Sequence, residues 1–334
     1  MKTQNKILTE ILNILLICAV CYINFSFGIG IFPITIISAV ILTVIFSNGT
    51  AKASVIKLVC GILVSVFILM NNTSPEEISR YLTIIVRIAD LFLPAYVLHL
   101  CFRNGKQNLG SAIFFTAGSN LIVTCLSLAQ TTFVDKINMI DEIEKMYDSI
   151  YTTYVSIIAG SGMNQNPEEI SVIFNAVKEL SVMLIPSVLI LSCIILSYIH
   201  IVFSRGMLKM YLKQEHNQIE YFYQIRTGKL LSTMTIILLL LTYFSGSSYF
   251  ASGVYNFAVV AGFIYVINGL AVVYFLLIKK TKKVSISIII LTLGIIVSII
   301  TSIIMPVANI FTVLFIVGLM DTTFNFRKLK KVGE

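Results

Sequence analysis

Residues 284–320 form a run of 37 residues without a charged side chain: Val284-Ser-Ile-Ser-Ile-Ile-Ile-Leu-Thr-Leu-Gly294-Ile-Ile-Val-Ser-Ile-Ile-Thr-Ser-Ile-Ile-Met-Pro306-Val-Ala-Asn-Ile-Phe-Thr-Val-Leu-Phe-Ile-Val-Gly318-Leu-Met320. As one helix the run would be about 55 Å long, at about 1.5 Å per residue, whereas the hydrocarbon core of a bilayer is about 30 Å thick. The run therefore predicts two membrane spans separated by a break. Pro306 is the residue expected to make that break, because proline interrupts helical hydrogen bonding.

The composition of the whole chain points the same way. Hydrophobic residues make up 57% of the chain and charged residues only 12%, with a mean hydropathy of +0.93. Soluble domains contain about 45–50% apolar and about 25% charged residues, so the chain is expected to be an integral membrane protein. Its net charge of +8 does not indicate a nucleic-acid partner, because the basic residues lie between apolar segments, where they orient a membrane protein.

A helix needs about 20 apolar residues to span a bilayer. Ten segments approach that length: 7–25, 30–47, 54–71, 82–102, 109–130, 181–203, 230–249, 255–278, 284–304 and 307–322. The expected fold class is all-α, a polytopic transmembrane helical bundle of about 8 to 10 spans. Residues 1–334 are expected to form a single integral membrane domain.

The basic residues indicate the orientation of these spans, because Lys and Arg gather in cytoplasmic loops. With both termini in the cytoplasm, 19 of the 24 Lys and Arg residues fall on the inner side, and the outer side holds only Arg80, Lys136, Lys145 and Lys178. The expected location is therefore the cell membrane, with multiple spans, cytoplasmic termini and the lipid bilayer as the surrounding partner.

Residues 131–180 form the one sizeable segment outside the apolar spans on the outer side. Apolar residues there recur at intervals of three and four, which predicts an extracytoplasmic amphipathic helix: Ile140, Ile143, Tyr147, Ile150 and Tyr154. Such a helix fits two arrangements equally well, a lid over the bundle or a helix lying on the membrane surface.

The inner loop 204–229 is both basic and aromatic. The simpler interpretation is a juxtamembrane helix held by anionic lipid, and the alternative is a docking site for a cytoplasmic partner.

A short sequence occurs twice in similar form: Ser74-Pro-Glu-Glu-Ile-Ser79 recurs as Asn166-Pro-Glu-Glu-Ile-Ser171. Both copies predict helix starts with Pro75 or Pro167 at the first helical position, and they indicate either an internal repeat or two helix starts that share one chemistry.

Arg87 and Asp90 are an opposite-charge pair inside the apolar segment 82–102. Charges at membrane depth cost free energy and often mark a functional site, and residues three apart share a helix face. About 20 residues counted back from Arg103 place both charges in the outer leaflet, which favours an outward-facing binding site or an interfacial ion pair. The candidate substrate-binding residues are therefore Arg87, Asp90 and Asn120. A buried amide such as Asn120 also suits a hydrogen bond between helices.

The sequence motifs of several common enzyme classes are absent. The sequence contains no P-loop, Gly-x-Ser-x-Gly, His-Glu-x-x-His or dinucleotide fingerprint. The only histidines, His99, His200 and His216, are isolated from one another. We therefore expect no enzyme activity, no cofactor and no metal site, and any ATP hydrolysis would have to come from a separate subunit.

The sequence is most distinctive at Ile267-Asn-Gly269-Leu-Ala271 and at Gly318-Leu-Met-Asp321-Thr-Thr-Phe324-Asn-Phe326-Arg327. The second stretch resembles the end pattern Gly-Leu-x-Asp-x-x-Phe-x-Phe-Arg of the YybS-like family of bacterial membrane proteins. On physical grounds, Arg327 is expected to reach lipid phosphate, and Asp321 is expected to cap the helix or to pair locally.

The YybS-like family is distantly similar to the substrate-binding subunits of energy-coupling-factor vitamin transporters. The resemblance implies a membrane subunit that captures a small molecule from outside and docks on a cytoplasmic ATPase or transmembrane coupling module. The alternative function is a membrane scaffold or regulatory protein that binds a protein partner without transport.

Overall fold

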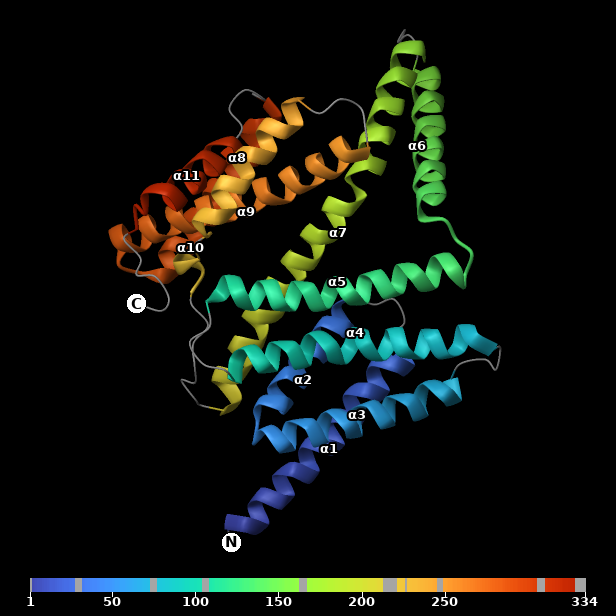
Figure 1. Cartoon of the computed structure of the whole chain (residues 1–334), viewed down its shortest axis with the longest axis vertical. Coiled ribbons are helices and arrows are strands. Elements are labelled where there is room, and N and C mark those ends of the chain that lie inside the picture. The colour runs from blue at the N-terminus through green and yellow to red at the C-terminus, as the bar shows by residue number, and fades with distance from the viewer. Residues whose placement is uncertain are drawn as a thin grey trace. The chain divides into compact units, whose positions relative to one another are not determined.

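The computed structural model of the chain describes these residues: 2–27, 32–72, 77–103, 108–161, 167–212, 221–225, 227–244, 249–304 and 310–327. Within them every regular element is a helix, which confirms the all-α prediction (Figure 1). The helices are α1 (Lys2–Phe27), α2 (Phe32–Ser47), α3 (Ala51–Asn72), α4 (Glu77–Arg103), α5 (Leu109–Phe133), α6 (Met139–Ser161), α7 (Pro167–Leu212), the 3₁₀ turn η1 (Phe222–Gln224), α8 (Lys229–Phe244), α9 (Tyr249–Thr281), α10 (Val284–Ile304) and α11 (Ile310–Phe324).

Each of the ten predicted spans coincides with a helix: the first five with α1 to α5, the sixth with α7, and the last four with α8 to α11. In the described part of the chain, six helices are long and apolar enough to cross a membrane, and α2, α10 and α11 are shorter apolar helices. The 37-residue run contains two helices among the described residues, α10 ending at Ile304 and α11 beginning at Ile310. Pro306 itself lies outside the described residues.

The chain divides into two compact units. The first unit holds residues 1–100 and 115–214, and the second holds residues 101–114 and 215–334. The expectation of a single integral membrane domain stays a prediction.

In the first unit the apolar core lies among α1, α2, α3 and α4, with Ile17, Phe46 and Leu91 almost fully buried. One polar contact in this unit joins α2 to α4. Ser47 Oγ lies 3.1 Å from His99 Nδ1. The His99 ring packs edge-on against Phe46, 6.3 Å between centroids.

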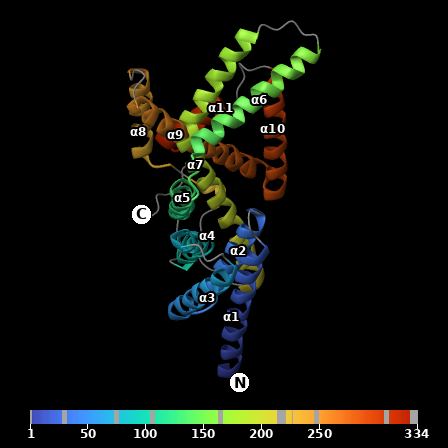
Figure 2. The same cartoon turned by 90° about the vertical axis from the view of Figure 1, so that its right-hand side faces the viewer.

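Helix α7 has 46 residues and is therefore about 69 Å long, more than twice the hydrocarbon thickness. It begins at Pro167, which confirms the predicted first helical position, and it continues past the predicted span to Leu212. Asn166, Ser74 and Pro75 lie outside the described residues. Figures 1 and 2 show α6, the predicted amphipathic helix, joined at its end to the start of α7. We call these two antiparallel helices the α6–α7 hairpin.

In the second unit α9 and α11 cross at unusually short range. A Cβ added at Gly269 would lie 2.0 Å from the Leu314 carbonyl oxygen, and one added at Gly318 would lie 2.0 Å from the Tyr265 carbonyl oxygen. Only glycine permits such contact between helix backbones, an arrangement common where membrane helices associate. Two of the distinctive sequence positions therefore have a packing role.

Candidate functional site

The three predicted substrate-binding residues lie in different surroundings. Arg87 is half-buried and Asp90 is exposed on α4, and the ion pairs among the described residues do not include one between them. Asn120 is buried on α5 and donates a hydrogen bond of 2.8 Å to Ser197 Oγ on α7. Asn120 thus makes an interhelical bond, and the assignment of all three residues to a substrate stays a prediction.

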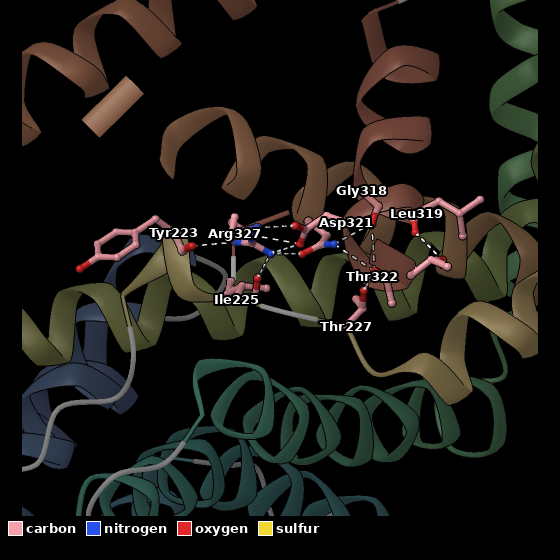
Figure 3. Close-up of polar contacts among 10 residues, drawn as sticks. Tyr223, Ile225, Thr227, Gly318, Leu319, Asp321, Thr322 and Arg327 are labelled. Carbon is pink, nitrogen blue, oxygen red and sulfur yellow. Dashed lines mark hydrogen bonds and ion pairs between the residues drawn. The ribbon is translucent and has the colours of Figure 1, made fainter. Parts of the chain in front are cut away.

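The strongest polar cluster that the structure describes surrounds Arg327, directly after α11 (Figure 3). Its side chain is buried, 1% exposed, against the fully buried Asp321, with Nη2 and Nε 2.7 and 3.1 Å from Asp321 Oδ2. Nη1 donates to the Tyr223 carbonyl at 2.7 Å, and Nη2 lies 2.6 Å from the Ile225 carbonyl. The guanidinium therefore joins the end of α11 to the segment around η1. We call this cluster the Arg327 node.

Neutral side chains extend the node into α9. Asn268 Oδ1 accepts from Arg327 Nη2 at 2.8 Å, while Asn268 Nδ2 donates to the Gly318 carbonyl at 2.8 Å. Thr322 Oγ1 lies 2.5 Å from Thr227 Oγ1. The buried charge pair thus shares hydrogen bonds with the η1 segment and with α9, which is how buried polar groups avoid a large desolvation cost.

The turn after α11 brings Arg327 back to Asp321. Asn325 has a φ of 51°, in the left-handed region, and its backbone N–H donates to the Asp321 carbonyl at 2.8 Å. Asparagine tolerates this conformation better than most residues, and it often ends helices in this way. The left-handed Asn325 therefore ends α11 at Phe324 and is followed by the turn that holds Arg327.

The expected contact of Arg327 with lipid phosphate is wrong. An arginine reaches for phosphate when its head group can remain hydrated, but this guanidinium is enclosed by Asp321, Asn268 and backbone carbonyls. Local pairing of Asp321 is confirmed. The two phenylalanines of the motif stack on each other, with 5.8 Å between the ring centroids of Phe324 and Phe326. They remain 65% and 54% exposed.

A second candidate site is a cavity of about 190 Å³ within the α6–α7 hairpin. Its lining includes Tyr147, Asp148, Tyr151, Ser171, Phe174 and Lys178. Lys178 Nζ lies 3.0 Å from Asp148 Oδ1 and 3.8 Å from Glu144 Oε2. Tyr151 packs edge-on against Phe174, 5.4 Å between centroids. The cavity thus combines flat aromatic walls with an ion pair, and we call it the hairpin pocket.

Sequence comparison places these features in a family. A family described as predicted membrane proteins (DUF2232) matches residues 11–322 of the chain. The chain belongs to this family. No curated protein and no solved structure matches the chain.

In this DUF2232 protein the family match spans the hairpin pocket and most of the Arg327 node. It includes Asn268, Gly269, Gly318 and Asp321, and it ends at Thr322, so Arg327 itself lies beyond the matched residues. The family assignment establishes a membrane protein and no more specific function.

The sequence-based reasoning about this DUF2232 protein missed one buried charge. Lys57 on α3 is 1% exposed, and its Nζ lies 3.0 Å from Glu10 Oε2 on α1 and 3.2 Å from the Ile45 carbonyl. It also donates to the Asn48 carbonyl. The sequence does not indicate this pair, because Glu10 lies 47 residues before Lys57 and no local pattern connects the two.

Replacing Lys57 with methionine is expected to lower the free energy of unfolding by about 2 kcal/mol, the scale of hydrogen bonds to a charged group. Lys52→Met is the matched control, because Lys52 is exposed one turn and a half earlier on the same helix. Pulse proteolysis of the purified protein during an SDS titration would measure both changes. Equal effects of the two substitutions would contradict a structural role for the Lys57–Glu10 pair.

Proposed function

We propose that this protein captures a small molecule outside the membrane and delivers it for transport, as a substrate-binding subunit without catalytic activity. The observation that carries the proposal is the hairpin pocket, which is lined by aromatic, hydroxyl and charged side chains. Most small-molecule sites combine apolar walls with a few placed polar groups in this way.

The position of the pocket on α7 supports the proposal. The lining residues Ser171, Phe174 and Lys178 lie in the first third of a helix that is far longer than a membrane span. Under the orientation predicted from the basic residues, this part of α7 stands outside the membrane and the rest crosses it. The same orientation would leave the inner loops available to a cytoplasmic ATPase or coupling module, as the resemblance to energy-coupling-factor subunits implies.

The orientation is testable with one added cysteine. Ser149 is exposed on α6, and Ser149→Cys in intact cells is expected to react with a membrane-impermeant maleimide. Lys280→Cys, at the exposed end of α9, should react only after the cells are permeabilised. The unmodified protein sets the background from its six native cysteines. The opposite labelling pattern would reverse the orientation and place the pocket in the cytoplasm.

Capture itself is testable by blocking the pocket. Ser171→Phe adds a ring to a lining position, whereas Val172→Phe adds the same ring next to it at a residue that is 67% exposed. In native mass spectrometry of protein purified in dodecyl maltoside, a small molecule should remain with the parent and with Val172→Phe, and it should be lost from Ser171→Phe. Arg87→Ala and Asp90→Ala, measured in the same way, would test the hypothesis that those charges contact the ligand.

The rival function is a scaffold that binds a protein partner without transport. One observation favours it: the α6–α7 hairpin exposes large apolar side chains, including Ile157 at 63% and Ile173 at 62%, and exposed apolar patches often mark protein interfaces. A stable protein partner that co-purifies equally with both phenylalanine variants, together with an empty pocket, would support the scaffold and reject capture.

A further inference from the structure

We propose that the ligand of the hairpin pocket is a small organic cation, with a primary or quaternary ammonium group. This inference rests on the proposed function and names the class of ligand that the same pocket takes. Three independent features support it: the charge of the surrounding segment, the way Lys178 is neutralised, and the aromatic walls.

The segment that carries the pocket is acidic within a basic protein. Residues 131–180 contain eight of the chain's 16 Asp and Glu residues and only three of its 24 Lys and Arg residues, whereas the whole chain has a net charge of +8. The segment therefore has a net charge of −5. A concentrated negative charge raises the local concentration of cations and speeds their arrival, and it repels anionic ligands over the same distance.

Among the described residues that line the pocket, Lys178 is the single cation, and it is already neutralised. Lys178 Nζ is paired with Asp148 at 3.0 Å and lies 3.8 Å from Glu144, so the three side chains together have a charge of −1. An anion would have to compete with Asp148 for the ammonium group of Lys178. A cation can instead bind the exposed oxygen atoms of Asp148, whose side chain is 69% exposed.

The aromatic walls suit an ammonium group. The Phe174 ring contacts Tyr151 at 5.4 Å and Tyr154 at 5.5 Å between centroids, and Tyr147 is fixed by a hydrogen bond of 2.6 Å between its hydroxyl and Ser181 Oγ. The faces of aromatic rings attract cations, and clusters of such rings are the usual recognition device for quaternary ammonium groups. Because the rings are held by one another, little side-chain freedom is lost when a ligand binds.

The size of the pocket limits the ligand. Its volume of about 190 Å³ is larger than a single water needs and smaller than the about 300–1,000 Å³ typical of sites for drug-sized molecules. A free alkylammonium ion, or the ammonium end of a longer molecule, fits this range.

Equilibrium dialysis with radiolabelled choline, tetramethylammonium and putrescine would test the proposal on the full-length protein in dodecyl maltoside, a detergent without a choline head group. 3,3-Dimethylbutan-1-ol is the matched ligand control, because it has the shape of choline without the charge. At least one of the three cations is expected to bind, and choline is expected to bind about tenfold more tightly than its neutral analogue.

Two substitutions should change cation binding in opposite directions. Asp148→Asn removes a negative charge and is expected to weaken binding about five- to tenfold, whereas Lys178→Met removes the competing positive charge and is expected to strengthen it several-fold. Glu142→Gln is the matched control, because Glu142 is exposed on the same helix, pairs with Lys145 and does not line the pocket. It should change binding by less than about twofold. Far-UV circular dichroism would show that each variant keeps its helices.

Several outcomes would overturn the proposal: binding of none of the three cations, equal binding of choline and its neutral analogue, or the opposite response of Asp148→Asn and Lys178→Met. If the pocket-blocking Ser171→Phe variant nevertheless lost a co-purified anion or neutral molecule, the capture function would stand and only the cation assignment would fail. If no molecule depended on Ser171, both would fail.

Discussion

Arg327→Ala is expected to destabilise the second unit by about 3–5 kcal/mol, the cost of removing one partner from a buried ion pair. The substitution would leave Asp321 fully buried without its cation, and it would also free the carbonyls of Tyr223 and Ile225. A loss of this size is a large part of the total free energy of unfolding of many proteins, which is about 5–15 kcal/mol. The folded fraction from size-exclusion chromatography and pulse proteolysis in SDS would measure it.

Milder substitutions separate charge from geometry at the Arg327 node. Arg327→Lys keeps the charge but cannot reach the two carbonyls and the carboxylate together, because lysine lacks the planar fork of arginine. It should therefore recover only part of the lost stability. In a double-mutant cycle, Asp321→Ala should cost much less in the Arg327→Ala background than in the parent. Additive effects would show that Asp321 and Arg327 do not depend on each other.

Gly269→Ala is expected to cost about 3 kcal/mol or more, because the new methyl group would overlap a backbone oxygen that cannot rotate away. The added Cβ would lie 2.0 Å from the Leu314 carbonyl oxygen, so α9 and α11 would have to separate. Separation would also pull Asn268 away from the Gly318 carbonyl, a bond of 2.8 Å next to the same crossing. The folded yield and the unfolding midpoint in SDS would both report the loss.

Gly262→Ala provides the matched control on the same helix. A Cβ at Gly262 would meet no atom within 4 Å, and alanine favours a helix over glycine by about 1 kcal/mol. This variant should be as stable as the parent or slightly more so. If Gly269→Ala and Gly262→Ala behaved alike, the close crossing of α9 and α11 would be contradicted.

The spans could be predicted from the sequence because each depends on a local run of apolar residues. The limits of such reasoning are clear at α7, where the predicted span began at residue 181 although the helix begins at Pro167. The first turns of α7, which the predicted span did not include, contain Phe174 and Lys178. A search for apolar runs does not find these turns, because polar residues interrupt them. The α7 half of the hairpin pocket therefore lay outside the predicted spans, just after the helix start predicted at Pro167, whereas Tyr147 on α6 belonged to the predicted amphipathic stripe.

The ion pairs of Arg327 and Lys57 could not be predicted fully, because both depend on contacts between distant segments. Asp321 and Arg327 are six residues apart, so a local pair was foreseeable, but the Tyr223 and Ile225 carbonyls are 104 and 102 residues away from Arg327. Lys57 and Glu10 belong to different helices. Pairing between distant segments is set by the way helices pack, which a periodicity in one segment does not encode.

The Arg327 node also sets an order of events during synthesis. The carbonyl of Tyr223 leaves the ribosome 104 residues before the arginine that binds it, and at roughly 5–20 residues per second this interval is roughly 5–20 s. During that time α8 to α11 have to insert, while Asn268 and the η1 segment lack the cation that joins them. The second unit can therefore close only as a late step of biogenesis, and an insertase or chaperone that shields its polar groups would act within that interval.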